Sequence, residues 1–88
     1  MSGPWPDWWA WELELTPHLE KRMEDRGFNE VDLRSMLHRA SGWRPDHVDG
    51  RFVIATSLRT RAWSVIVEPD LDAVLLVVIA AYPIENTP

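Results

Sequence analysis

Apolar and polar residues alternate along residues 9–15, and this period of two predicts a strand with one buried face. Thr16 and Pro17 follow, a pair typical of a helix N-terminus: threonine caps the free backbone amides, and proline needs no hydrogen bond in the first turn. We expect this first helix to run to about Arg26, because Gly27 supplies the left-handed residue that commonly ends a helix.

A second helix is predicted to begin directly afterwards. Asn29 is a favourable N-cap, and Asp32 three residues later occupies the position of a capping box. Residues 41–42, Ser-Gly, mark the end of this helix. Its apolar stripe consists of Val31, Leu33, Met36, Leu37 and Ala40. Two short helices joined this tightly predict a helix hairpin or a bent pair.

The rest of the chain has the pattern of strands, and its Asp-Gly dipeptide at residues 49–50 is a strong hairpin signal. We predict strands at 51–57, 61–68 and 73–82, with 43–48 as a further short strand. The long apolar run of the last strand predicts a central position covered on both faces. The order strand–helix–helix–strand–strand–strand predicts an α+β fold, in which both helices pack on one face of a three- to five-stranded antiparallel sheet.

Length and composition indicate one globular domain. We predict an irregular tail over residues 1–8, a single α+β domain over 9–83 and a C-terminal tail over 84–88. Cysteine is absent, which excludes disulfides, thiolate metal sites and cysteine nucleophiles and fits a reducing cytoplasm. The start lacks the pattern of a signal peptide. The apolar run at residues 73–81 is far shorter than the roughly 20 residues that span a bilayer. We therefore expect a cytoplasmic protein without a membrane association.

The net charge of −5 argues against a free-standing nucleic-acid binder, because such proteins usually attract phosphates with an excess of positive charge. All the lysine and arginine residues fall between Lys21 and Arg61, however, while acidic residues dominate both ends of the sequence. A local basic patch is therefore still expected on an acidic protein.

Three residues at four-residue spacing, His18, Arg22 and Arg26, lie on one face of the first predicted helix. Histidine is a natural general acid or base near neutral pH, and arginine binds phosphate with two parallel hydrogen bonds. The competing interpretation is a solvated helix face whose arginines form ion pairs. The acidic residues available for such pairs are Glu20, Glu24, Asp25 and Glu30.

Further arginines occur near the predicted hairpins. Arg51 and Arg61 would lie on adjacent strands, with Arg59 close by in the sequence, and together they would form a cationic clamp for a phosphate. They would equally serve to discourage pairing between sheet edges. The only tyrosine, Tyr82, ends the last strand, where its hydroxyl would orient a nucleophile or a phosphate, or simply point into water above the core.

Tryptophan is frequent, with six in 88 residues. The alternation of the first strand places Trp9 and Trp11 in the core. Trp5 and Trp8 lie in the predicted tail. They would fold back over the domain, dock on a partner protein or on a second copy in a homodimer, or stack on nucleic-acid bases.

We predict no metal ion and no cofactor. His38, Asp46, His47 and Asp49 are metal ligands by type, but their spacing matches no standard motif, and Asp49 is explained by its turn. The sequence also contains no glycine-rich phosphate loop, no serine nucleophile elbow and no pair of carboxylates typical of a glycosidase.

Several of these residues carry a resemblance to a known family, which covers about residues 13–83. The residues in question are His18, Arg22-Met23, Arg26-Gly27, Gly50-Arg51, Arg61, Trp63, Glu68-Pro69 and Tyr82-Pro83. With them the chain resembles a family of small bacterial domains of unknown function that is grouped with the BrnT and RelE-type toxins. These toxins belong to the barnase/EndoU/colicin/RelE ribonuclease fold.

The resemblance implies a metal-independent endoribonuclease of a toxin–antitoxin system, with RNA as substrate and an antitoxin protein as partner. It implies catalytic roles for His18, Arg61 and Tyr82, and the helix spacing adds Arg22 to the predicted catalytic residues. RNA contacts are expected from Arg26, Arg51 and Arg59. One position departs from the pattern, because Ala80 stands where the family usually has a threonine, and the missing hydroxyl predicts weakened or absent catalysis. The alternative is a catalytically inactive interaction module that docks through Trp5 and Trp8.

Overall fold

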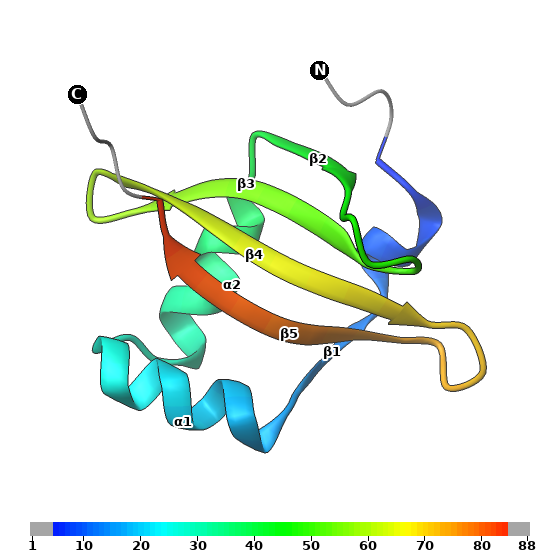
Figure 1. Cartoon of the computed structure of the whole chain (residues 1–88), viewed down its shortest axis with the longest axis horizontal. Helices are drawn as coiled ribbons and strands as arrows, with labels where there is room; N and C mark the ends of the chain where they lie inside the picture. Colours follow the sequence, from blue (N-terminus) through cyan, green and yellow to red (C-terminus); the bar gives the residue numbers. More distant parts are fainter. Residues whose placement is uncertain (1–4, 85–88) are drawn as a thin grey trace.

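Two helices and a five-stranded sheet build residues 5–84, the part of the chain that this computed structural model describes (Figure 1). The elements are a 3₁₀ turn Asp7–Ala10, β1 Glu12–Leu15, α1 Pro17–Arg26, α2 Glu30–His38, β2 Gly42–Pro45, β3 Phe52–Leu58, β4 Arg61–Asp70 and β5 Leu75–Pro83. The predicted α+β class is confirmed. Most of the two predicted tails, at residues 1–4 and 85–88, lies outside the described residues.

The sheet has the strand order β1-β5-β4-β3-β2. Strands β2 to β5 form the predicted antiparallel meander, but β1 runs parallel to β5, so the sheet is mixed and the expected purely antiparallel sheet is wrong. Parallel neighbours are not joined by a tight turn, and no local sequence signal announces such a pairing. The last strand is an interior strand, as expected, because β5 lies between β1 and β4. The expected cover on both of its faces is wrong, since both helices of the described residues pack on one face of the sheet.

Both helices begin and end as the capping residues predict. The Thr16 hydroxyl accepts a hydrogen bond from the Leu19 amide at 3.0 Å, and Gly27 ends α1 in the left-handed conformation with φ of 75°. Asn29 and Asp32 form a full capping box at the start of α2. These caps satisfy amides and carbonyls that a short helix would otherwise leave unbonded.

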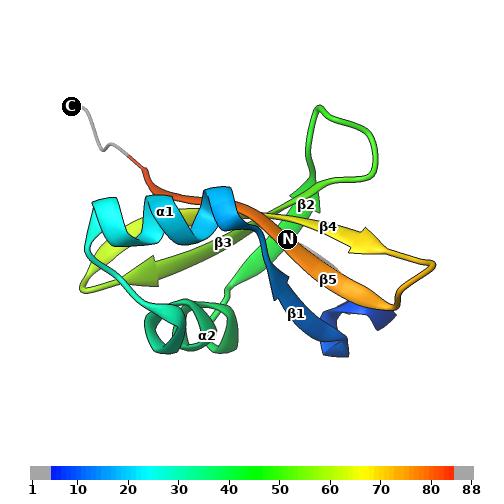
Figure 2. The ribbon, with the colours of Figure 1, turned by 90° about the horizontal axis from the view of Figure 1, so that it is seen from below.

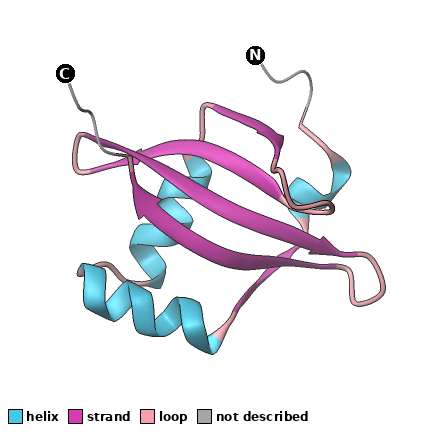
Figure 3. Ribbon diagram, in the orientation of Figure 1, coloured by secondary structure: helices cyan, strands magenta, loops and turns pink. Residues whose placement is uncertain are grey.

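The N-terminal strand is shorter than the alternation predicts (Figure 3). The chain winds through the 3₁₀ turn from Asp7 to Ala10, closed by hydrogen bonds from the Trp9 amide to the Pro6 carbonyl and from the Trp11 amide to the Trp8 carbonyl. Trp9 and Trp11 are half-buried and pack against the core, so their predicted place in the core is confirmed only in part, and both lie before β1.

The core lies between the helices and one face of the sheet. Figure 2 shows α2 across that face and α1 along the β5 side, while the connection between β2 and β3 rises on the opposite side. Fully buried core residues come from both helices and from β3, β4 and β5, and they include Leu19, Leu33, Met36, Ile54, Val65 and Val78. The other face of the sheet carries no helix among the described residues. We call it the helix-free face.

Candidate functional site

Helix α1 has two chemically different flanks on either side of its buried residues Leu19 and Met23. One flank carries His18, Arg22 and Arg26, which are exposed and lie one turn apart; we call them the α1 stripe. The other flank carries glutamates, which line a cavity of about 320 Å³ together with residues of α2. The helix therefore separates positive charge on one side from negative charge on the other.

The α1 stripe faces strand β5. Pairing between β1 and β5 ends at Leu15 and Val78, so the outer edge of β5 is not paired with β1 beyond that point. There α1 packs beside β5, and Arg26 Nη1 donates a hydrogen bond to the Ala81 carbonyl at 3.0 Å (Figures 1 and 2). This bond joins residues far apart in the sequence. It fixes the last turn of the helix against the end of the strand.

Other arginines gather at the same end of the sheet, where the β3–β4 turn meets the junction of α1 and α2; we call this region the turn end. Arg39 donates to the Ser57 carbonyl at 2.8 Å. Arg59 forms two longer contacts of 3.4 Å, one with the Gly27 carbonyl and one with the Asp32 carboxylate. The predicted RNA-binding residues Arg26 and Arg59 are thus both at the turn end, and both already have partners within the protein.

Arg61 begins β4 at the turn end. It lines a cavity of about 340 Å³ with Thr60, Ala62 and Ile84. Within residues 5–84, neither Arg61 nor Arg22 forms an ion pair with a carboxylate, so both guanidinium groups are free to bind an external anion. They differ in this respect from the arginines that are bound to backbone carbonyls.

Tyr82 directly follows Ala81, whose carbonyl accepts the hydrogen bond from Arg26. Ala81 is fully buried and faces the core, so strand alternation puts the 40% exposed Tyr82 on the helix-free face, beside Ser64 of β4. Arg61 lies two positions before Trp63 in β4, so it points to the same face of the sheet, which is the face toward the core. The side chains of Tyr82 and Arg61 therefore leave the sheet on opposite faces, although their strands are neighbours.

His18 is in the first turn of α1 and Arg26 is in the last. Their Cα atoms are about 12 Å apart along the helix axis at 1.5 Å per residue. The structure therefore brings Arg26, Arg59, Arg61 and Tyr82 to one end of the sheet. Arg22 lies between that end and His18.

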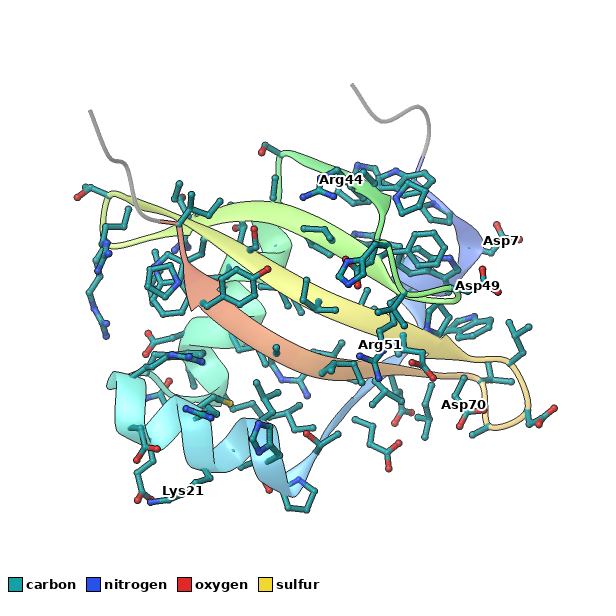
Figure 4. The ribbon with its side chains drawn as sticks, viewed as in Figure 1. Asp7, Lys21, Arg44, Asp49, Arg51 and Asp70 are labelled. Carbon is teal, nitrogen blue, oxygen red and sulfur yellow. The ribbon has the colours of Figure 1, made fainter. Side chains whose placement is uncertain are left out.

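Arg51 does not belong to this group. Its Nε donates to Glu68 Oε1 at 2.9 Å near the far end of β4, whereas Leu58 and Arg61 pair at the near end (Figure 4). The expected clamp of Arg51 with Arg61 is wrong, because the hairpin puts the two arginines beside opposite ends of the same strand pair.

Trp5 and Trp8 fold back over the domain. Trp5 stacks on Trp9 with ring centroids 4.3 Å apart, and Trp8 packs on Phe52 at 4.9 Å and on the edge of Trp43 at 6.1 Å. Of the three predicted roles for these residues, packing on their own domain is the one that the structure shows. It leaves Trp5 37% exposed.

The side chains considered as metal ligands are not brought together. Asp46 Oδ1 and His47 Nδ1 form a contact of 3.2 Å in the β2–β3 connection, and His38 ends α2. In the part of the chain that the structure describes, no three histidine, aspartate or glutamate side chains are grouped so that they could hold a metal ion. Over the same residues, no helix combines the length and the apolar composition that crossing a membrane requires.

The sequence did not single out two arginines, Arg34 within α2 and Arg39 at the C-cap of that helix. Arg34 pairs with Glu30 and lines a cavity next to the N-terminal segment, and Arg39 binds the end of β3. The spacing of four residues between Glu30, Arg34 and His38 was the available signal, since it puts all three on one helix face.

The chain has no detectable relative in three comparisons. No protein-family model matches it, and neither the curated proteins nor the solved structures include a significant match. The resemblance to the BrnT and RelE-type toxins stays a prediction.

Proposed function

We propose that this domain is a toxin-like, metal-independent endoribonuclease that binds RNA along the α1 stripe and the adjoining edge of β5. The observation that carries the proposal is the hydrogen bond from Arg26 to the Ala81 carbonyl, since it aligns a row of basic side chains with the end of the strand that bears Tyr82. A cytoplasmic location and a cognate antitoxin partner belong to the same proposal.

The charge distribution supports RNA as the ligand. His18, Arg22 and Arg26 repeat about every 6 Å along the helix axis, a step comparable to that between successive phosphates of an extended single strand. Arg22 and Arg61 have no carboxylate partner among residues 5–84, so a phosphate would meet them without first breaking an ion pair. The acidic net charge is compatible with this, because the potential near a surface depends on local charges.

The chemistry needs only groups present in the chain and in the RNA. The RNA 2′-oxygen attacks the adjacent phosphorus while His18 removes its proton, and the bond from phosphorus to the 5′-oxygen breaks. The leaving oxygen takes a proton from water, which gives a 2′,3′-cyclic phosphate and a 5′-hydroxyl. Arg22, one turn from His18, stabilises the charge on the phosphate oxygens. Arg61 and Tyr82 leave opposite faces of the sheet at the turn end, so they would hold neighbouring parts of the RNA and not the phosphate that is cleaved. Ala80 offers no hydroxyl beside Tyr82, so we expect a slow enzyme.

The decisive experiment measures cleavage of an end-labelled single-stranded RNA in the presence of EDTA. We expect wild type to produce fragments with a 2′,3′-cyclic phosphate, and His18→Ala to lower the rate about 100-fold or more, as loss of a general base does. Lys21→Gln is the matched control, since Lys21 lies on the same helix but pairs with Asp25 at 3.3 Å. Equal rates in wild type and His18→Ala would contradict the proposal, and so would an absolute need for a metal ion.

Expression in bacteria gives a second readout. Wild type should slow growth, and His18→Ala should relieve the effect at the same protein level. Equal, harmless expression of both would contradict a toxin function.

A second candidate function is binding of a partner protein without catalysis. It is favoured by the helix-free face, where Tyr82 and Ile84 are 40% and 44% exposed. This surface replaces the Trp5 and Trp8 patch of the sequence-based alternative, because Trp8 is packed within the domain. Tyr82→Arg would abolish binding to a partner or dimerisation through this face, whereas His18→Ala would leave either unchanged. A homodimer would appear as concentration-dependent sedimentation.

A further inference from the structure

A cavity of about 240 Å³ lies between the N-terminal segment, β1 and α2. Its floor is apolar, with Leu37 and Leu76, and its walls are formed by Trp9, Trp11, Arg34 and His38. Flat aromatic surfaces, an apolar floor and two nitrogen-bearing polar side chains thus converge on one small hollow. Such a combination is typical of small-ligand sites, in which a few polar groups orient a largely apolar contact.

Arg34 is oriented at this cavity by one ion pair on its own helix. Its Nε donates to Glu30 Oε2 at 2.8 Å, one helical turn earlier. This bond uses one of the five donors of the guanidinium, and neither Nη atom has an acceptor among residues 5–84. His38 is exposed one turn later and forms no ion pair within the same residues. Both side chains therefore have hydrogen-bonding capacity left for an anion.

Trp11 supplies the aromatic surface. Trp9 has Trp5 stacked on it at 4.3 Å and Trp8 against it at 6.2 Å. Trp11, in contrast, contacts no other aromatic ring among the described residues, although it is only half-buried. Trp11 also packs against the core, so the part of its indole that lines the cavity is what is left for stacking on a flat ligand.

We propose that this cavity binds a single heteroaromatic ring that carries one phosphate group, as in a nucleoside monophosphate. The ring stacks on Trp11, and the phosphate binds Arg34 and His38. The volume is below the roughly 300–1,000 Å³ of sites for drug-sized ligands, which limits the ligand to one ring system and one small anionic group. The site does not depend on the proposed ribonuclease function, because it lies between α2 and β1 and shares no residue with the α1 stripe.

The experiment titrates the full chain with adenosine monophosphate and follows the indole N–H signals by NMR. We expect the signals of Trp9 and Trp11 to shift, while Trp63, which packs on Phe28 and does not line the cavity, stays unchanged. Adenosine and inorganic phosphate are the half-ligands. Each should bind at least about tenfold more weakly than the nucleotide, because each lacks either the stacking or the charged hydrogen bonds.

Two variants separate a specific site from general attraction of anions. Arg34→Gln should weaken the nucleotide about tenfold and leave adenosine unchanged. Arg44→Gln removes the same charge from β2 and should have no effect, since Arg44 does not line the cavity (Figure 4). Glu30→Gln keeps Arg34 but loosens its orientation, so it should weaken binding less than Arg34→Gln does.

Four results would overturn the proposal. The first is the absence of Trp9 and Trp11 shifts at saturating nucleotide. The second is equal affinity for the nucleotide and for adenosine, and the third is an equal loss of affinity in Arg34→Gln and Arg44→Gln. A short RNA that shifts these signals while the mononucleotide does not would also contradict it, since the ligand would then be a polynucleotide.

Discussion

The two ends of the sheet are stabilised by different chemistry. At the turn end, Arg26, Arg39 and Arg59 each donate a hydrogen bond to a backbone carbonyl of another element. At the opposite end, which we call the aromatic end, the N-terminal segment packs its tryptophans on β2 and β3, with Trp8 between Phe52 and Trp43. The turn end thus combines charged donors with one buried ring pair, Phe28 and Trp63, whereas ring contacts of half-buried tryptophans build the aromatic end.

The charges follow the same division. The acidic side chains at the aromatic end include Asp7, Asp46, Asp49, Glu68, Asp70 and Asp72, and Figure 4 shows three of them on that side. A nucleic acid would be repelled there and attracted at the turn end. This difference between the two ends shows that arginine has two roles in this protein. Some arginines connect elements, and only Arg22 and Arg61 near the turn end are left without a partner for a phosphate among residues 5–84.

The largest effect should come from removing an aromatic ring at either end. Trp63 is 6% exposed and meets Phe28 edge to face at 5.0 Å, so Trp63→Ala should lower the free energy of unfolding by about 3–5 kcal/mol. Trp8 is only half-buried, and Trp8→Ala should cost about half as much. Urea denaturation followed by circular dichroism measures both.

Equal losses in these two variants would show that the aromatic end is as much part of the core as the buried ring pair. No loss in Trp8→Ala would show instead that the N-terminal segment contributes no stability. Either result would contradict the division of the molecule into a main core and a less stabilising aromatic cluster at the aromatic end.

The next-largest effect is expected on RNA affinity, at an arginine that forms no ion pair among the described residues. Arg22→Gln should weaken binding of single-stranded RNA about tenfold and reduce the slope of log affinity against log salt by about one. Fluorescence anisotropy at several salt concentrations measures this. Lys21→Gln removes the same charge from the neighbouring position, but Lys21 pairs with Asp25, so its effect should be smaller. If both variants lose the same affinity, net charge alone governs binding and the α1 stripe has no special role.

Local features of the fold were predictable from the sequence. The caps at Thr16 and Asn29, the glycine after α1 and the Asp-Gly turn each depend on residues within four positions, and each is present. The pairing of β1 with β5 was not predictable, because it joins the two ends of the described chain without a turn between them.

The candidate site shows the same limit. Four-residue spacing was enough to put His18, Arg22 and Arg26 on one flank of a helix. The sequence did not reveal that this flank faces β5, nor that Arg51 pairs with Glu68, because both facts depend on contacts between distant residues. Likewise, nothing in Arg59 or Thr60 indicates a positive φ, since such turns usually contain asparagine or glycine.

Backbone strain in the turns predicts opposite changes in the free energy of unfolding for two variants, one in the β3–β4 turn and one in the β2–β3 connection. Thr60 has φ of 67° without being glycine, so Thr60→Gly should relieve backbone strain and raise the free energy of unfolding by about 0.5–1 kcal/mol. Gly50 in the β2–β3 connection has φ of 84° and open space around it. Gly50→Ala should therefore lower the free energy of unfolding by about 1 kcal/mol through strain alone.

Thermal unfolding of the two single variants and of the double variant checks this. The effects should add, because the turns are at opposite ends of β3. A stabilising Gly50→Ala would mean that the β2–β3 connection adapts, and a destabilising Thr60→Gly would mean that the Thr60 side chain contributes more than its strain costs.

The smallest effect is expected at Trp43, on the aromatic end. Its Nε1 is buried and has no hydrogen-bond partner among the described residues, a state that costs about 1–3 kcal/mol. Trp43→Phe removes this donor together with part of the ring, so the lost packing and the removed penalty should offset each other within about 1 kcal/mol. Trp63→Phe loses packing without this compensation and should be clearly destabilising. Chemical denaturation of the two variants side by side gives the comparison. If Trp43→Phe costs as much as Trp63→Phe, the Trp43 indole N–H has a partner in solution, and the aromatic end is held by a polar contact as well as by rings.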